Sequence, residues 1–227
     1  MSPITFLDNS FHGKYREFFS GLYKRNKKLL ILSVSIFFLF LIVGVIMGYF
    51  LPDAIESFLT GVINQIQGVT VNIDTFSIFL HNLRSIFMTY VGGILGVIPA
   101  LVLGSNGFIY GSFVGYFIHG GVLNNYGVSN PLYFIIYTLP HGIFEIPGLI
   151  ISGTAGFRLA SAVLNYLRNI GKDTPIDNYW ELKDSLALFV IGIVLTFIAA
   201  IIEANFSLSI GNYITGLNIH HALVGNY

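Results

Sequence analysis

Long apolar runs separated by short polar segments dominate this 227-residue chain. The first run, residues 29–51, contains no charged residue over 23 positions, and Pro52 follows it directly. An α-helix needs about 20 apolar residues to cross a hydrocarbon core of about 30 Å. We therefore predict that this run is a membrane-spanning helix.

Four further apolar stretches have the length of a span or nearly so: residues 76–103, 107–123, 131–157 and 186–206. The first of these is expected to end, through Pro99, in a turn at residues 104–107. Pro140 and Pro147 lie inside the third of them, where each proline removes a backbone donor and disturbs the preceding turn. The pattern predicts an all-α membrane protein, a bundle of about five transmembrane helices with a discontinuous fourth span. If that span is instead a hairpin of two half-spans, the number is six.

The distribution of charges predicts the orientation of the chain. Six of the eleven basic residues precede the first span, and an excess of Lys and Arg marks cytoplasmic segments. The segment 52–75 has acidic residues but no Lys or Arg, as expected for an external loop, and no Lys or Arg follows Lys183. We expect a multi-pass protein of the cell membrane with a cytoplasmic N-terminus. Its parts are a cytoplasmic amphipathic segment (1–28), a transmembrane helical domain (29–206) and an external tail (207–227).

The composition agrees with a membrane location and excludes several kinds of chemistry. Hydrophobic residues make up 54% of the chain and charged residues 10%, against about 25% charged residues in an ordinary soluble domain. The net charge is zero, which gives no support for a nucleic-acid partner. Because the chain has no cysteine, disulfides, thiolate metal sites and a cysteine nucleophile are excluded. Membrane lipids are the expected surroundings.

Small residues form a stripe on the third predicted span. Gly107, Gly111 and Gly115 fall four residues apart on one helical face, and His119 continues that face. Glycines at this spacing allow a second helix to approach to backbone contact. We interpret the stripe as a packing face, and we expect association with other membrane proteins, or self-association, through such glycine-rich faces.

A few polar side chains lie inside the predicted spans, where ionisable groups are costly and normally face a bundle interior or a water-filled cavity. They are Asn82, Arg84, Asn106, His141, Glu145 and Glu203. His141 and Glu145 are four residues apart, so on an uninterrupted helix they share a face. Pro140 precedes this pair and can leave nearby backbone carbonyls free for an ion, a water or a side chain. The segment 140–147 is the most unusual stretch of the chain.

Three functional interpretations follow from these residues. The first is a non-enzymatic membrane component, a scaffold or permease-like subunit organised around the polar cluster. The second is a transporter or channel for an ion or small polar solute, in which Glu145 takes a proton or ion, His141 relays or orients, and Arg84 attracts an anionic group. The third is a metal-dependent intramembrane hydrolase.

A structural role and a metal site remain as further interpretations of the same side chains. Arg84 could neutralise Glu145 or Glu203, because a buried ion pair costs less than two unpaired charges. His141 and Glu145 could bind a divalent metal, but they supply two ligands where zinc normally takes at least three from the protein. His119 is a third ligand only if the third and fourth spans hold it at the same depth. No other cofactor is predicted.

One sequence motif resembles a known family. The run Pro-His-Gly-Ile-Phe-Glu at residues 140–145, followed by Gly153, Gly156 and Arg158, resembles the signature of the stage II sporulation protein M family. Other segments resemble the remaining landmarks of that family: residues 82–84, 106–107 and 199–203. The resemblance therefore covers roughly residues 25–206.

The resemblance implies a multispanning membrane protein. In spore-forming bacteria such a protein acts in a membrane complex with cell-wall-degrading partners during engulfment of the forespore. The family is similar across many organisms that make no spores, so the sporulation name describes one branch of it. The positions that the family pattern carries over are Asn82, Arg84, Asn106, His141, Glu145, Arg158 and Glu203.

Overall fold

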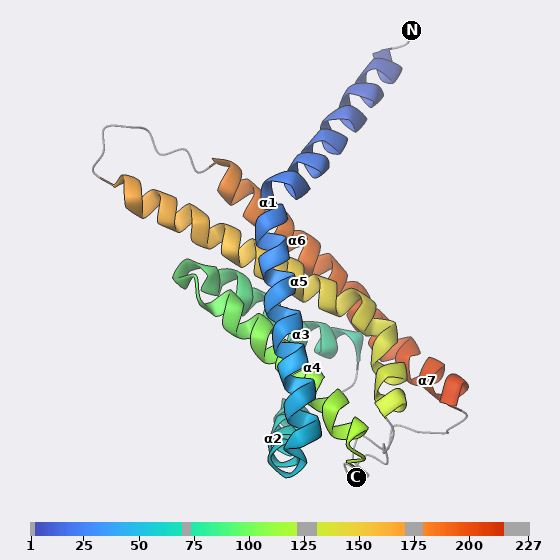
Figure 1. Ribbon diagram of the computed structural model, residues 1–227. Helices are drawn as coiled ribbons and strands as arrows, with labels where there is room; N and C mark the ends of the chain where they lie inside the picture. The colour runs from blue at the N-terminus through green and yellow to red at the C-terminus, as the bar shows by residue number, and fades with distance from the viewer. Residues whose placement is uncertain (1–2, 70–73, 122–130, 171–178, 216–227) are drawn as a thin grey trace.

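The computed structural model describes residues 3–69, 74–121, 131–170 and 179–215, and every regular element within these ranges is a helix (Figure 1). Five helical segments are long and apolar enough to cross a membrane: residues 17–50, 75–95, 98–118, 134–169 and 179–207. Many large apolar side chains are exposed on these segments, as expected for surfaces that face lipid. The chain is therefore an all-α, multi-pass membrane protein, which confirms the predicted fold class.

The N-terminal region is a single helix, α1 (Pro3–Phe50), whose 48 residues include both the predicted cytoplasmic segment and the first span. Its axis changes direction, and Figure 1 shows the dark-blue N-terminal part at an angle to the rest. A second helix, α2 (Pro52–Val69), follows directly where the sequence predicted an external loop. Proline is compatible with the first position of a helix, because the N–H that it lacks has no intrahelical partner there. Ile55 and Leu59 hold α2 against Tyr116.

The boundary between the second and third spans differs from the prediction. Helix α3 (Thr75–Val91) continues into a 3₁₀ turn, η1 (Gly92–Leu95), and α4 (Ile98–Ile118) begins inside the stretch that was expected to be one span. The chain turns at Gly96, whose φ of 75° lies in the left-handed region that favours glycine. Pro99 lies in the first turn of α4, a position that proline accepts.

The predicted turn at residues 104–107 is therefore wrong, because these residues lie within α4. The predicted packing face is confirmed, and α1 of the same chain covers it. A Cβ atom at Gly107 would overlap the carbonyl oxygen of Phe37, and one at Gly111 would overlap that of Leu41. These glycines stay helical because their close contact with α1 offsets their weak helix propensity.

An N-cap fixes the start of α3. The carboxylate of Asp74 accepts hydrogen bonds from the backbone N–H groups of Phe76 at 2.8 Å and Ser77 at 2.9 Å, and from the Ser77 hydroxyl at 2.9 Å. These bonds, chiefly those from Ser77, hold the pKa of Asp74 below its ordinary value. The cap sets the register of α3 and thus the depth at which Asn82 and Arg84 lie.

The two prolines of the fourth stretch lie inside a continuous helix, α5 (Pro131–Asn169). The predicted discontinuity takes the form of a bend instead of a break. Figure 1 shows the first, yellow-green turns of α5 at an angle to the remainder. A proline can stay in a helix within a membrane when neighbouring groups satisfy the freed carbonyls. The helix also continues past residue 157, the predicted end of the span.

The last span is α6 (Tyr179–Ile202), which starts earlier than residue 186, the predicted beginning. A π-helical turn, η2 (Glu203–Ser207), follows it, and a short helix, α7 (Leu208–Thr215), completes the described chain. The predicted tail beyond residue 215 lies outside the described residues.

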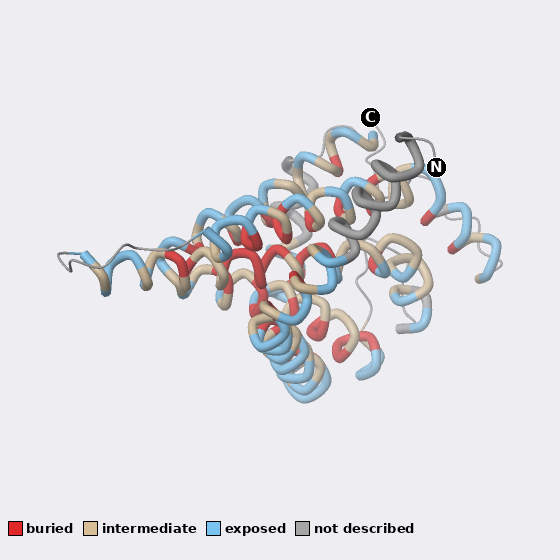
Figure 2. The backbone as a smooth tube through the Cα atoms, turned by 90° about the horizontal axis from the view of Figure 1, so that it is seen from above, coloured by how far each residue is buried: buried red, intermediate tan, exposed pale blue. Residues whose placement is uncertain are grey.

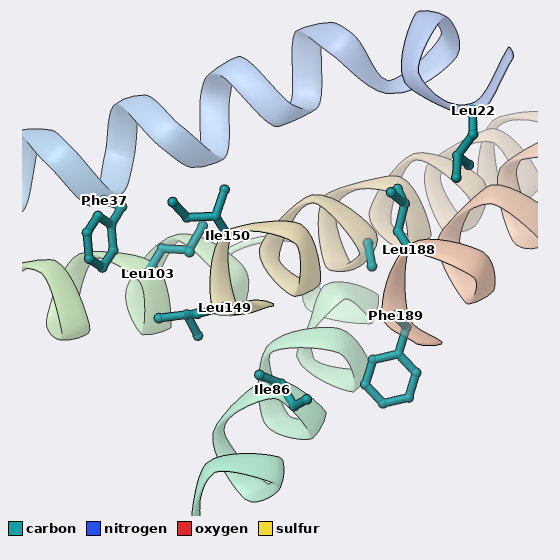
Figure 3. Packing of buried hydrophobic residues seen from close by; sticks show 9 residues of the cluster. Leu22, Phe37, Ile86, Leu103, Leu149, Ile150, Leu188 and Phe189 are labelled. Atoms are coloured by element: carbon teal, nitrogen blue, oxygen red, sulfur yellow. The ribbon is translucent and has the colours of Figure 1, made fainter. Parts of the chain in front are cut away.

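The apolar core lies where the spans meet. Figure 3 shows Phe37, Leu103 and Leu149 close together, contributed by α1, α4 and α5. At the other side of the core, the ring of Phe189 stacks on that of Tyr90 with centroids 4.2 Å apart. Figure 2 shows buried residues gathered along the helix contacts, while the outer faces of the same helices are exposed. This core fixes the positions of α3, α4, α5 and α6, which carry the polar residues of the candidate site.

Candidate functional site

A cavity of about 810 Å³ lies among α2, α3, α4, α5, α6 and η2, and we call it the polar cavity. Its polar lining consists of His81, Asn82, Arg84, Ser85, Asn106, Tyr110, Tyr137, Thr138, His141, Glu145, Thr196 and Glu203. Six of the seven site residues predicted from the sequence are in this set. Arg158 is the exception.

Three ionisable side chains of the polar cavity are close enough to act together. His141, Glu145 and Glu203 each offer one ligand atom, and these atoms lie within 4.8 Å of one another. The Nε2 atom of His141 is 3.9 Å from Oε2 of Glu145, and the hydroxyl of Tyr110 donates to that same oxygen at 3.2 Å. Solvent reaches 13% of the His141 side chain and 23% of the Glu145 side chain. We call these three residues the cavity triad.

Two features of the backbone produce the cavity triad. His141 and Glu145 lie one turn apart on α5, directly after Pro140 in the bent part of the helix. Glu203 begins the π-helical turn, and such turns often mark functional sites because they re-aim side chains within a helix. The last residue of that turn, Ser207, contacts the triad with its hydroxyl.

Ser207 orients the imidazole ring of His141. The Ser207 Oγ atom lies 2.9 Å from Nδ1 of His141 and 3.4 Å from the carbonyl oxygen of Ile202. The contact at Nδ1 leaves Nε2 on the side of the ring that faces Glu145.

Arg84 is not paired with the carboxylates of the polar cavity. It lines the same cavity, but within the described chain no ion pair of 4.0 Å or less joins it to a carboxylate. The interpretation in which Arg84 neutralises Glu145 or Glu203 consequently has no direct contact to support it. His141 lies 3.9 Å from Glu145 and neutralises that carboxylate only when its ring is protonated.

Arg158 belongs to a second polar group toward the opposite end of the bundle, which we call the ion-pair cluster: Arg25, Asn26, Arg158, Glu181 and Asp184. The Arg25 guanidinium donates to both Asp184 carboxylate oxygens at 2.6 and 2.7 Å. Asn26 donates to the same carboxylate at 2.9 Å, and Arg158 lies 3.9 Å from the carboxylates of both Asp184 and Glu181. Asp184 is fully buried. Two cations and two carboxylates thus balance in this cluster.

Sequence reasoning missed several residues that build these two groups. Tyr110 follows Asn106 by one helical turn, so helical spacing could have found it. Ser207 gave no signal, because the π-helical turn that aims its hydroxyl has no recognisable sequence pattern. Arg25 and Asp184 are 159 residues apart, and nothing in the linear pattern indicated that they pair.

The third possible metal ligand is also different from the one considered. Glu203 joins His141 and Glu145, whereas His119 lies exposed at the end of α4, where its ring contacts that of Tyr49. The third ligand of the metal hypothesis is therefore Glu203, at the start of η2, in place of His119.

Comparisons with known proteins agree with the resemblance seen in the motif. A family model described as Stage II sporulation protein M matches residues 36–208. An uncharacterized protein of Methanocaldococcus jannaschii is 30% identical over 197 residues, which cover 82% of this chain and 84% of that protein. A second uncharacterized protein of the same organism is 35% identical over 154 residues, covering 66% and 79% respectively. No solved structure matches the chain.

Proposed function

Because the chain belongs to the stage II sporulation protein M family and is a multi-pass membrane protein, we propose that it acts as a permease-like protein that admits a small ion or polar solute into the polar cavity. The observation that carries this proposal is the cavity of about 810 Å³ around six of the predicted polar residues. A scaffold held by a buried structural lock has no use for such a space. A permease requires a cavity that admits its solute, and charged residues within a membrane normally face such a water-filled pathway.

The two polar groups support an arrangement with one accessible end and one closed end. The lining of the polar cavity includes Val62 of α2 and Phe134 in the first turns of α5, so the cavity extends toward the end of the bundle where α2 lies (Figure 1). The ion-pair cluster joins α1, α5 and α6 toward the other end. A bidentate pair between Arg25 and the fully buried Asp184 is suited to holding those helices together.

The charge rule adds a direction to this proposal. With a cytoplasmic N-terminus, the end of the bundle that carries α2 faces outward and the ion-pair cluster lies toward the cytoplasm. The cavity then accepts its ligand from outside. The orientation itself is part of the proposal, and the experiment below reads it directly.

Access to the polar cavity can be measured with single cysteines, because the natural chain contains none. Ser85 lines the cavity, whereas Ser152 is fully buried outside its lining and serves as a matched control. In closed membrane vesicles of known orientation, a small membrane-impermeant thiol reagent should modify Ser85→Cys in the folded protein. It should modify Ser152→Cys only after denaturation. The side from which Ser85→Cys reacts identifies the open end.

Each outcome of this experiment has a clear meaning. Modification of Ser85→Cys from the outer side supports the proposal as stated, and modification from the cytoplasmic side reverses its direction. If Ser85→Cys is as protected as Ser152→Cys, water does not reach the cavity. The permease-like function is then wrong, and a scaffold organised around a dry polar cluster replaces it.

A further inference from the structure

The cavity triad combines the ligand types of a divalent transition-metal site. Zn²⁺ binds histidine nitrogens and carboxylate oxygens, and catalytic zinc sites use three protein ligands with one open position. The ligand atoms of His141, Glu145 and Glu203 lie within 4.8 Å of one another. Around one Zn²⁺ with bonds of about 2.1 Å, tetrahedral ligand atoms are about 3.4 Å apart, so the ligand atoms must approach one another by up to about 1.4 Å.

The surroundings of the triad orient its ligands as in established metal sites. A histidine that binds a metal usually donates its other ring N–H to a neighbouring group, which fixes the ring and its tautomer. Ser207 is such a neighbour for His141, with its Oγ 2.9 Å from Nδ1, and Nε2 is the nitrogen left to bind a metal. Tyr110 donates to the Glu145 carboxylate at 3.2 Å, a contact that holds a ligating carboxylate in place.

Charge and an unpartnered hydroxyl also indicate a ligand. Glu145 and Glu203 face one cavity with no Lys or Arg within 4.0 Å among the described residues, and two carboxylates this close need a proton or a cation between them. Thr196, two helical turns before Glu203, lines the same cavity and is 1% exposed. Its Oγ1 atom has no hydrogen-bond partner in the described part of the chain. That oxygen is free to hydrogen-bond a molecule inside the cavity.

From these observations we propose that His141, Glu145 and Glu203 bind one divalent transition-metal cation, with Zn²⁺ as the best match to the ligand set. The site rests on the proposed function, because the cation enters through the polar cavity, and it names the class of ligand that the cavity admits. His141 coordinates through Nε2 and the two glutamates through carboxylate oxygens. Ser207 and Tyr110 are positioning residues.

Equilibrium dialysis of the purified full chain against Zn²⁺ alone tests the site. The background carries His220→Gln and His221→Gln, because these adjacent histidines lie outside the described residues and could bind Zn²⁺ themselves. We expect one Zn²⁺ per chain, at least about 100-fold weaker binding in the near-isosteric Glu145→Gln and Glu203→Gln, and about 10-fold weaker binding in Ser207→Ala. Glu181→Gln, in the ion-pair cluster, is the matched control and should bind like the parent.

Several results would overturn the metal site. If the parent binds no more Zn²⁺ than Glu203→Gln does, protons neutralise the carboxylates and the proposal is wrong. If Glu181→Gln and Glu203→Gln lose Zn²⁺ affinity equally, binding depends on the net charge of the protein and not on the cavity triad. If the glutamine variants elute as misfolded protein on size exclusion, the smaller change Ser207→Ala tests the site instead. An unchanged Zn²⁺ affinity of Ser207→Ala would then contradict the proposed geometry.

The labelling of Ser85→Cys separates this proposal from the proposed function. If Ser85→Cys is labelled but the protein binds no Zn²⁺, the cavity is accessible and the proposed metal site is wrong. If the protein binds Zn²⁺ but Ser85→Cys is not labelled, the metal is incorporated during folding. The permease-like function is then wrong, and the three metal ligands stand.

Discussion

The ion-pair cluster and the cavity triad use similar side chains in opposite ways. In the ion-pair cluster the Asp184 carboxylate is fully buried and accepts two hydrogen bonds from Arg25 and one from Asn26. In the polar cavity the Glu145 carboxylate is 23% exposed and accepts one hydrogen bond from Tyr110. A charge within a membrane protein can thus be neutralised by partners inside the protein or placed beside a cavity, and the two arrangements suit different roles.

The two arginines that the family resemblance singled out illustrate this difference. Arg158 lies 3.9 Å from two carboxylates and contributes to the balanced ion-pair cluster. Arg84 lines the polar cavity without an ion pair of 4.0 Å or less in the described residues. A family motif can therefore contain one arginine that joins an ion-pair cluster and another that lines a cavity.

The largest effect is expected from removing the charge of Asp184. Asp184→Asn leaves Arg25 and Arg158 with one carboxylate between them, and breaking a buried ion pair costs about 3 kcal/mol. Thermal unfolding in detergent should show this loss of stability. The matched change Glu181→Gln, at a partly exposed carboxylate with one contact of 3.9 Å, should cost less than about 1 kcal/mol. Equal stabilities of Asp184→Asn and the parent would contradict a structural role for the cluster.

A smaller loss is expected where α1 packs on α4, which connects the two regions. Helix α1 carries Arg25, and α4 carries Tyr110, so their contact determines how the ion-pair cluster and the cavity are placed. Gly111→Ala puts a methyl group against the backbone of Leu41 and should cost about 2 kcal/mol. Gly61→Ala, in open space on α2, should stabilise the protein by up to about 1 kcal/mol. Unfolding measurements that rank the two variants in the reverse order would disprove this packing.

The smallest effect separates paired from unpaired charges directly. A double-mutant cycle with Arg25→Gln and Asp184→Asn should give a coupling energy of about 1 kcal/mol, because these groups are in contact. The same cycle with Arg84→Gln and Glu203→Gln should give a coupling near zero in metal-free buffer. A coupling of similar size in both cycles would place Arg84 in an ion pair and remove the distinction between the two regions.

Much of the candidate site was predictable because ionisable residues are rare in these spans. His141 and Glu145 could be placed together from their spacing of four residues, and Glu203 from its position in the last span. The meeting of Glu203 with this pair could not be predicted, since it depends on the packing of α5 against α6. Ser207 was missed for a related reason, because only the π-helical turn directs its hydroxyl to His141.

The sequence by itself determined the membrane location, a number of five or six spans and the small set of polar residues, because the cost of placing polar groups in lipid leaves long apolar runs that can be recognised in the linear sequence. Only the tertiary structure decided where the second span ends. The glycines at residues 104–107 favour a turn in isolation, and their contact with α1 keeps them helical. The tertiary structure also divided the polar residues into a balanced ion-pair cluster and an unneutralised cavity triad. That division depends on distances between helices far apart in the chain, which no local pattern encodes.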